Sequence, residues 1–181
     1  MKKVAVVTVG FNTEEDTKVL LQSLEKVKTT DFFLEIIVVD NGSKKVFSLT
    51  KKEKKENIIL IRSEENTGFA GGYNIGMKKA LDDDADYILI VNNDTTMDPE
   101  LLVNMLKVLE SDKKIGVTVP KIYFAKGHEF HKDRYNKDEL GKVFWYAGGS
   151  TDWSHVKSIH RGVDEVDHGQ YDQIEQTTFA T

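Results

Sequence analysis

Residues 88–99 read ILIVNNDTTMDP, an apolar run that changes abruptly into a polar one. Residues 87–91 are almost continuously apolar and rich in β-branched side chains, which is typical of a strand buried on both faces. Asn92, Asn93 and Asp94 follow within one short segment. A buried strand that delivers two amides and a carboxylate to its end raises the question of what these side chains bind.

The same pattern recurs along the chain and decides the fold. Apolar runs predict further strands at residues 4–9, 36–39, 58–61 and, more loosely, 115–119. Helical periodicity predicts helices at residues 14–28, 44–56, 72–82 and 99–110. Strands and helices in repeated alternation predict an α/β doubly wound, mainly parallel sheet with helices on both faces.

Local signals support some of these helices more than others. Asp98 and Pro99 supply an N-cap and a first position for the last helix. Thr13 and Asp16 resemble a weak capping box before the first helix. The stretch 44–56 is rich in lysine and has few apolar positions, so its helix is expected to be short and its charges to form a solvated face.

The composition narrows the class of protein. A chain of 181 residues with 39% hydrophobic residues is long enough for one domain with a sizeable core and part of a second. A formal net charge of −5 gives no reason to expect nucleic acid as a partner. The absence of cysteine excludes a disulfide framework. No apolar run reaches transmembrane length, so the default compartment is the cytoplasm.

The ends of the predicted strands point to the functional region. Right-handed crossovers bring the carboxyl ends of parallel strands to one edge of the sheet, where ligands of such folds bind. Four polar segments follow the four strands: GFN (10–12), DNGS (40–43), SEENTGFAGG (63–72) and NNDTT (92–96). Their convergence at one edge predicts a binding site there.

Asp94 is the first candidate in that site. In an extended strand end, Asn92 and Asp94 are two residues apart and point the same way. Such an oxygen pair suits Mg²⁺ or Mn²⁺, because hard cations keep several waters and are completed by substrate phosphates. The alternative is a cap for the following helix, but Asp98 already has that role.

Asp40 and the glycines after the third strand each have two interpretations. The carboxylate of Asp40 can accept a hydrogen bond from a ribose hydroxyl or a base N–H, or it can bond the backbone of its own Asp-Asn-Gly-Ser turn. Gly68, Gly71 and Gly72 precede a helix whose N-terminus favours a phosphate, or they serve a loop that needs positive φ angles. Their spacing matches no standard phosphate motif.

Two other segments receive structural interpretations. The stretch HEFH (128–131) lacks the four-residue histidine spacing of zinc proteases. The stretch DDDAD (82–86) precedes a strand rather than following one, so it is read as an exposed turn away from the functional edge.

The regular alternation of strand and helix ends after Pro120. We therefore predict a nucleotide-binding α/β core at residues 1–120 and the incomplete start of an acceptor-side region at residues 121–181. A strand is expected at residues 143–149. The chain stops in the apolar segment TTFAT (177–181), which suggests a fold cut short and an exposed patch that favours self-association.

Four segments taken together resemble the family 2 glycosyltransferases of the GT-A fold, in a form similar to bacterial rhamnosyltransferases. They are, in order, VTVGFN (7–12), VVDNGS (38–43), NTGFAGGYNIGM (66–77) and ILIVNNDTTMDPELL (88–102). WYAGGSTDW (145–153) extends the resemblance to almost the whole chain.

The resemblance implies inverting transfer of a sugar from a UDP- or dTDP-linked donor to a saccharide or lipid-linked acceptor hydroxyl. It implies Mg²⁺ or Mn²⁺ as cofactor and a role in cell-wall or polysaccharide biosynthesis, at the inner face of the membrane in a full-length enzyme. Asp94 would coordinate the metal and Asp40 would contact the base. The remaining donor-binding residues would be Val9, Gly10, Asn12, Asn66, Gly68, Gly71, Asn74, Asn92 and Asn93.

Two departures from the family pattern shape the expectation for this chain. Asn92 replaces the usual first acid of the metal motif, and an amide carries no charge. Family members continue past the TTFAT segment to an acidic motif that supplies the catalytic base, so the base is expected beyond Thr181 and transfer by this chain alone is expected to be negligible. The alternative to a glycosyltransferase is a module that binds a nucleotide but has no catalytic activity. An oxidoreductase of the Rossmann type would need a glycine fingerprint, which GFNTEE (10–15) lacks.

Overall fold

The computed structural model describes residues 1–180. The chain divides into two compact units, Met1–Val103 and Asn104–Thr181. Within the described residues, no helix is both long enough and apolar enough to cross a membrane.

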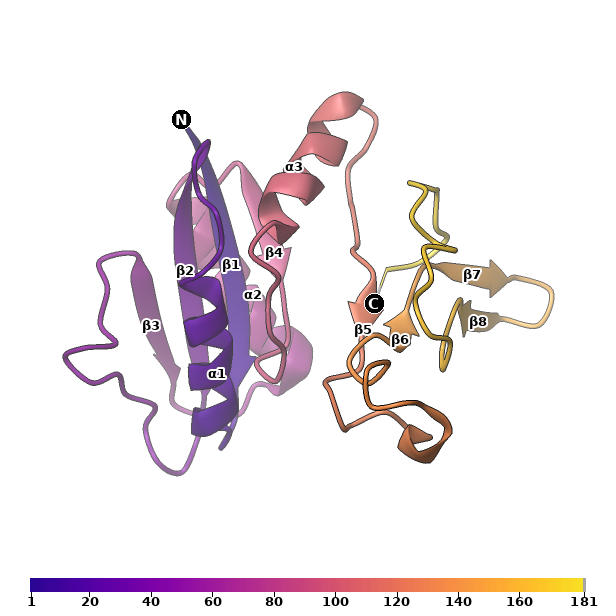
Figure 1. Cartoon of the computed structure of the whole chain (residues 1–181). Coiled ribbons are helices and arrows are strands. Elements are labelled where there is room, and N and C mark those ends of the chain that lie inside the picture. Colours follow the sequence, from indigo (N-terminus) through magenta and orange to yellow (C-terminus); the bar gives the residue numbers. More distant parts are fainter. Residues whose placement is uncertain (181) are drawn as a thin grey trace. The chain divides into compact units, whose positions relative to one another are not determined.

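The first unit is built on one parallel sheet. Its strands are β1 (Lys2–Gly10), β2 (Phe32–Asn41), β3 (Ile58–Ser63) and β4 (Tyr87–Ile90), in the spatial order β3-β2-β1-β4 (Figure 1). The register places Gly10 opposite Asp40 and Asp40 opposite Arg62, so the polar strand ends lie side by side. The predicted α/β doubly wound fold, including these four strands, is confirmed.

Helices cover both faces of this sheet. Helix α1 (Glu14–Leu24) lies in front of the sheet in Figure 1, and α2 (Gly68–Asp82) lies behind it. Helix α3 (Leu101–Ser111) follows β4. Asp98 accepts a hydrogen bond from the backbone N–H of Glu100 at 2.8 Å, in the turn that leads into α3. The helix begins at Leu101, so the predicted first position, Pro99, lies two residues before its start.

Helix α2 approaches the sheet closely because glycine faces it. A Cβ atom on Gly76 would lie 2.3 Å from Val7 Cγ1 and 3.2 Å from Val39 Cγ2. These valines belong to the buried cluster on this face, together with Ala5, Ile37, Tyr73 and Ala80. Real carbon atoms do not come so close, so only glycine allows α2 to sit at this height over β1 and β2.

Thr8 is a polar residue in the middle of this apolar sheet. Its side chain is fully buried, and its hydroxyl has no hydrogen-bond partner among the residues described. A buried hydroxyl without a partner costs free energy, whereas an apolar group of the same shape does not. We therefore expect Thr8→Val to raise the free energy of unfolding by about 1 kcal/mol, as measured by urea denaturation. A destabilised variant would show that the hydroxyl is bonded.

The second unit consists of short antiparallel strands. Strand β5 (Ile122–Tyr123) pairs with β6 (Phe144–Tyr146), and β7 (Gly149–Asp152) pairs with β8 (Lys157–His160). A short 3₁₀ turn, η1, covers Lys132–Arg134. The core of the unit contains Val143, Phe144 and Tyr146, all fully buried.

Thr177 and Phe179 of the TTFAT segment contact this core. The hydroxyl of Tyr146 donates a hydrogen bond to the carbonyl of Phe179 at 2.7 Å, and the Phe179 ring contacts both Tyr146 and His160. Phe179 is therefore half-buried and does not supply the exposed apolar patch that the sequence suggested. Self-association of the chain stays a prediction.

Three predicted elements differ in the structure. Residues 115–119 form no strand, and Val117 is 74% exposed. The lysine-rich stretch 44–56 contains turns rather than a helix, because it has no apolar face to bury. The strand expected at 143–149 is interrupted at Gly148, whose φ of 108° no extended strand tolerates.

Candidate functional site

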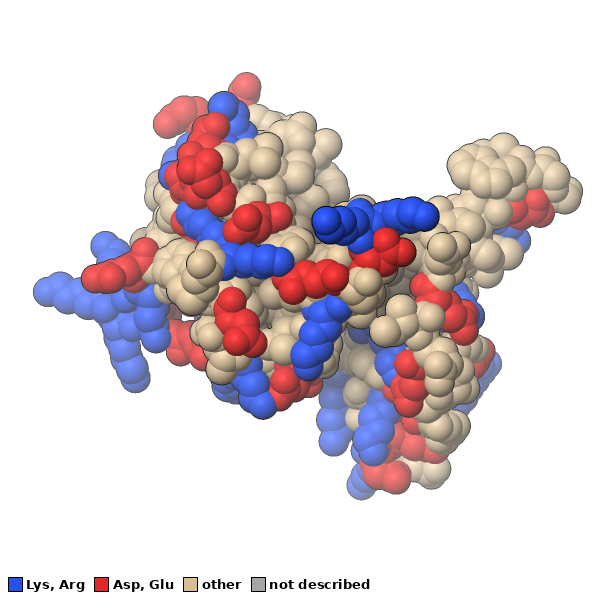
Figure 2. Space-filling model, turned by 90° about the horizontal axis from the view of Figure 1, so that it is seen from above, with Lys and Arg blue, Asp and Glu red and all other residues tan. Residues whose placement is uncertain are grey.

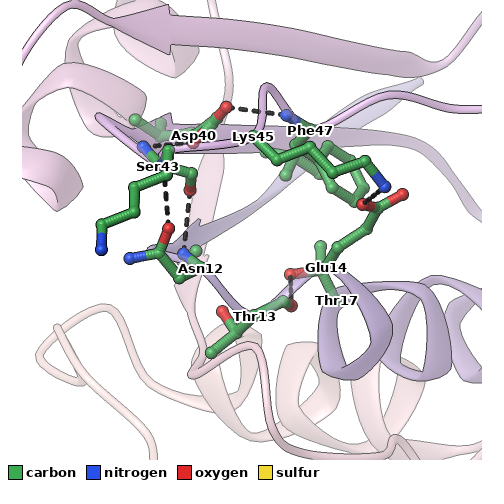
Figure 3. Close-up of a pocket in the computed structure, with 12 residues that line it drawn as sticks. Asn12, Thr13, Glu14, Thr17, Asp40, Ser43, Lys45 and Phe47 are labelled. Carbon is green, nitrogen blue, oxygen red and sulfur yellow. Dashed lines mark hydrogen bonds and ion pairs between the residues drawn. The ribbon is translucent and has the colours of Figure 1, made fainter.

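The carboxyl ends of β1 and β2 border a pocket of about 230 Å³ (Figure 3). One wall comes from the end of β1 and the start of α1: Gly10, Asn12, Thr13, Glu14 and Thr17. The other comes from the end of β2 and the loop after it: Val38, Val39, Asp40, Ser43, Lys44, Lys45 and Phe47. The pocket combines apolar, aromatic and hydrogen-bonding groups, as small-molecule sites do.

Asn12 joins the two walls. Its backbone N–H donates to Ser43 Oγ at 2.9 Å, and its Oδ1 accepts the backbone N–H of Lys44 at 2.9 Å (Figure 3). The residue has φ of 59°, a left-handed conformation that asparagine adopts more readily than most residues. Asn12 therefore fixes the shape of the pocket through its backbone and its side chain.

Asp40 is 5% exposed, and its carboxylate is fully engaged with protein groups. It accepts backbone N–H groups of Ser43 at 3.1 Å and Phe47 at 2.8 Å, and Arg62 Nη1 at 2.6 Å. Burial alone would raise the pKa of Asp40, but the hydrogen bonds from Ser43, Phe47 and Arg62 outweigh it and lower that pKa.

These contacts agree with the turn interpretation of Asp40. Arg62 Nη2 also donates to the Ser43 carbonyl at 2.8 Å, so Asp40 and Arg62 together hold the loop that closes the pocket. A contact between Asp40 and a nucleotide base stays a prediction.

The segment before α2 is organised by Asn41, which the sequence analysis did not select. Asn41 is 3% exposed, and its Nδ2 donates to Asn66 Oδ1 at 3.1 Å and to the Gly68 carbonyl at 3.0 Å. Its Oδ1 accepts the N–H and hydroxyl of Thr67 at 3.1 and 2.8 Å. The amide thus uses its full hydrogen-bonding capacity to anchor this segment to β2.

Helix α2 begins four residues earlier than the sequence predicted. Gly68, with φ of 75°, is its first residue, so Gly71 and Gly72 belong to the helix rather than to a loop. Asn66 Oδ1 accepts the N–H of Gly68 at 2.9 Å, and Asn74 is exposed on the helix. Gly72 needs its small size, because a Cβ there would lie 2.7 Å from Val9 Cγ1.

Asn92 to Thr95 form a turn at the end of β4. The strand ends at Ile90, and the hydroxyl of Thr95 donates to the carbonyl of Asn92 at 2.8 Å. Asn92 and Asp94 therefore do not lie in an extended strand, and the prediction that they point the same way for that reason is wrong. The geometry of the turn, rather than the alternation of side chains along a β-strand, sets where these side chains lie.

Asn93 attaches this turn to α1. Its Nδ2 donates to Thr13 Oγ1 at 2.6 Å and to Thr17 Oγ1 at 2.9 Å. Thr13 makes no capping hydrogen bond with α1, so the predicted capping box is absent and its hydroxyl accepts from Asn93 instead. Asn93 thereby links the end of β4 to the wall of the pocket.

Asp94 differs from its neighbours in this turn. It is exposed, and it has no hydrogen-bond or ion-pair partner among residues 1–180. Burial and, to a smaller extent, the charge of Asp94 raise the pKa of Tyr73. A carboxylate without protein partners, at a sheet edge beside a pocket, is free to bind an external ligand.

The side chains that could serve as metal ligands here suit only one kind of metal site. Residues 1–180 contain no cluster of three or more His, Asp or Glu side chains that could enclose an ion. A single carboxylate with neighbouring amide oxygens fits a magnesium-like cation that takes one or two carboxylates and completes its shell with phosphates and water. These residues fit a cation shared with a phosphate ligand.

The opposite edge of the sheet carries acidic residues in structural roles. Asp82 pairs with Lys78 at 3.1 Å and Asp83 with Lys79 at 2.6 Å, both along α2. Figure 2 shows acidic and basic side chains interspersed over the face that it presents. A substitution of Asp82 can therefore serve as a control for substitutions at the candidate site.

Comparison with known proteins gives a consistent result. The family model described as glycosyl transferase family 2 matches residues 5–166. The chain is 34% identical over 106 residues to the uncharacterized protein MJ0544 of Methanocaldococcus jannaschii, a match that covers 56% of this chain and 44% of that protein. It is 27% identical over 124 residues to the low-salt glycan biosynthesis hexosyltransferase Agl10 of Haloferax volcanii, covering 68% and 38%.

A solved structure shows the same fold. S. aureus TarS 1–349 superposes with a TM-score of 0.51 and 26% sequence identity, over 67% of this chain and 39% of that chain. The chain spans less than half the length of these three proteins.

Proposed function

Because this chain belongs to glycosyl transferase family 2 and has the GT-A fold, we propose that it binds a nucleotide-sugar donor at the carboxyl edge of its parallel sheet. The observation that carries the proposal is the exposed carboxylate of Asp94, which has no partner among the described residues. It lies in the turn that Asn93 ties to the pocket wall at Thr13. A nucleoside in the pocket would place its diphosphate toward this turn.

The donor is proposed to be a UDP- or dTDP-linked sugar. The pocket of about 230 Å³ has room for part of a nucleotide, such as its base, and less than the 300 Å³ or so of a whole drug-sized site. TarS has also been solved in complex with UDP-GlcNAc, and Agl10 is named as a hexosyltransferase. The TarS complex supports a uridine nucleotide as the first ligand to test, and the name of Agl10 supports a hexose as the sugar.

Asp94 and Asn92 would hold Mg²⁺ or Mn²⁺ in this proposal. A bound cation would neutralise negative charge on the diphosphate as it leaves the sugar. The chain's own part is to orient the donor: Asn12 and Asp40 shape the nucleoside pocket, and Asn93 fixes the turn beside it. These contacts preorganise the site before any ligand arrives.

The transfer itself is proposed to invert the configuration of the sugar. The hydroxyl of a saccharide or lipid-linked acceptor forms a bond to the anomeric carbon while the bond to the diphosphate breaks. The hydroxyl proton passes to a carboxylate general base. No residue of this chain is assigned to that role.

Calorimetric titration with UDP, dTDP and GDP tests the binding proposal. We expect UDP or dTDP to bind in Mn²⁺ and to bind at least about tenfold more weakly when EDTA removes the ion, because phosphates complete the metal shell. Equal binding with and without the ion would contradict the metal assignment. Absence of binding by every nucleotide would contradict the proposed function.

A further inference from the structure

Tyr73 connects helix α2 to the turn that holds Asp94. The residue is 4% exposed, and its ring belongs to the buried cluster between α2 and the sheet. Its hydroxyl lies within donor distance of two acceptors, the carbonyl oxygen of Val91 at 2.9 Å and the side-chain oxygen Oδ1 of Asn92 at 3.1 Å. The hydroxyl therefore contacts the residue that precedes the turn and the first residue of the turn.

A count of hydrogens limits what this hydroxyl can do. A tyrosine hydroxyl has one hydrogen to donate, and its oxygen can accept in addition. Two acceptor oxygens at 2.9 and 3.1 Å cannot both be satisfied by that one hydrogen. The carbonyl of Val91 can only accept, so it takes the hydrogen, and the best partner for the hydroxyl oxygen is then an N–H group.

The side-chain amide of Asn92 can supply that N–H group. Rotation of the amide by half a turn exchanges Oδ1 and Nδ2 without changing the shape of the side chain. Nδ2 then donates to the Tyr73 hydroxyl, and Oδ1 faces away from it. Because Asn92 is exposed, that oxygen is available to a ligand in the turn.

We propose that Tyr73 is a positioning residue that sets the amide orientation of Asn92, so that Asn92 presents its oxygen beside Asp94 to a divalent cation. An N–H group facing the cation would repel it, whereas an amide oxygen is a suitable ligand. The inference rests on the proposed function, since it requires a cation at Asp94.

The test compares four proteins: the parent, Tyr73→Phe, Asn92→Asp and the double variant. Mn²⁺ affinity is measured by electron paramagnetic resonance in the presence of saturating UDP, and unfolding by circular dichroism. We expect Tyr73→Phe to weaken Mn²⁺ binding by about tenfold in the parent background, which is typical when a group that orients a metal ligand is removed.

The Asn92→Asp background distinguishes two possible roles of Tyr73: orienting the side-chain amide of Asn92, and stabilising the fold in general. A carboxylate has two equivalent oxygens and offers one to the cation whichever way it is turned. Tyr73→Phe should therefore change Mn²⁺ affinity by less than about twofold in that background. An equal loss in both backgrounds, or no loss in the parent, would overturn the role of Tyr73.

Failure of this inference is distinguishable from failure of the proposed function. If the parent binds UDP and Mn²⁺ but Tyr73→Phe leaves the affinity unchanged, only the inference is wrong. If the parent shows no Mn²⁺-dependent binding, the proposed function fails and the inference fails with it. Should Tyr73→Phe not fold, Asn92→Ala tests the same oxygen: its removal should weaken Mn²⁺ binding about tenfold, and unchanged affinity would overturn the inference.

Discussion

Replacement of Asp94 by alanine is expected to weaken Mn²⁺-dependent binding of a nucleoside diphosphate by about tenfold or more, because it removes the only charged ligand that we assign to the cation. Asp94 is exposed and has no partner among the described residues, so the folded state loses no contact with the substitution. The melting temperature should therefore stay close to that of the parent. Calorimetry with UDP and a thermal melt measure the two effects.

Asp82→Ala is the matched control for this variant. Asp82 has the same charge, is also exposed, and lies at the far end of α2 beside Lys78. Its loss should leave nucleotide affinity unchanged. Equal affinity of the Asp94→Ala variant and the parent in Mn²⁺ would show that Asp94 does not hold the ion. A similar decrease in both variants would indicate a nonspecific effect of charge.

The second large effect is expected at Asp40, on stability. Asn keeps the shape of the side chain but removes its charge and places an N–H group where an acceptor was bonded. Ser43 donates to Oδ1, whereas Phe47 and Arg62 both donate to Oδ2. The one oxygen of asparagine can therefore serve either Ser43 or the pair Phe47 and Arg62, and the amide N–H faces the donor or donors that are left without a partner. We expect Asp40→Asn to lower the free energy of unfolding at pH 7 by about 1–3 kcal/mol in urea denaturation.

The pH dependence of this difference identifies its cause. Hydrogen bonds to the ionised form lower the pKa of Asp40 in the folded state, so its contribution to stability is complete above the unfolded pKa of about 3.9. The contribution is lost as the pH falls through the lower, folded-state pKa. The difference between parent and variant should thus be constant near neutrality and shrink in acid. A difference that persists unchanged at pH 2 would mean that the charge of Asp40 is not responsible.

The sequence was sufficient to predict the sheet but not all of the chain. The two central strands, β1 and β2, are buried over most of their length, so each contains a continuous apolar run that can be read directly. The outer strands β3 and β4 are present as predicted but partly exposed. Ile90 is 49% exposed, so the expectation that the strand at residues 87–91 is buried on both faces is wrong. Residues 115–119 also contain β-branched residues, but they include Gly116 and have no paired strand among the described residues. A strand depends on a neighbour, which no local pattern reveals.

The position of the candidate site could be predicted from the sequence, but only some of its residues could. Asp40 and Asp94 could be selected because each follows an apolar run that predicts a strand. Arg62 and Tyr73 could not, since their roles depend on the register of β2 with β3 and on how α2 packs over β4. Asn41 shows the same limit: it sits in the DNGS segment, but its partners are about 25 residues away in the chain.

The most direct test of a donor site at this edge uses the paramagnetism of Mn²⁺. Amide signals near the ion broaden in a nitrogen–proton correlation spectrum when Mn²⁺ and UDP are added to the labelled chain. A cation at Asp94 predicts that residues 92–95, and residues 10–13 next to Asn93, broaden first, while residues 82–86 at the opposite edge remain sharp. Broadening centred on residues 82–86, or none that depends on UDP, would contradict the account.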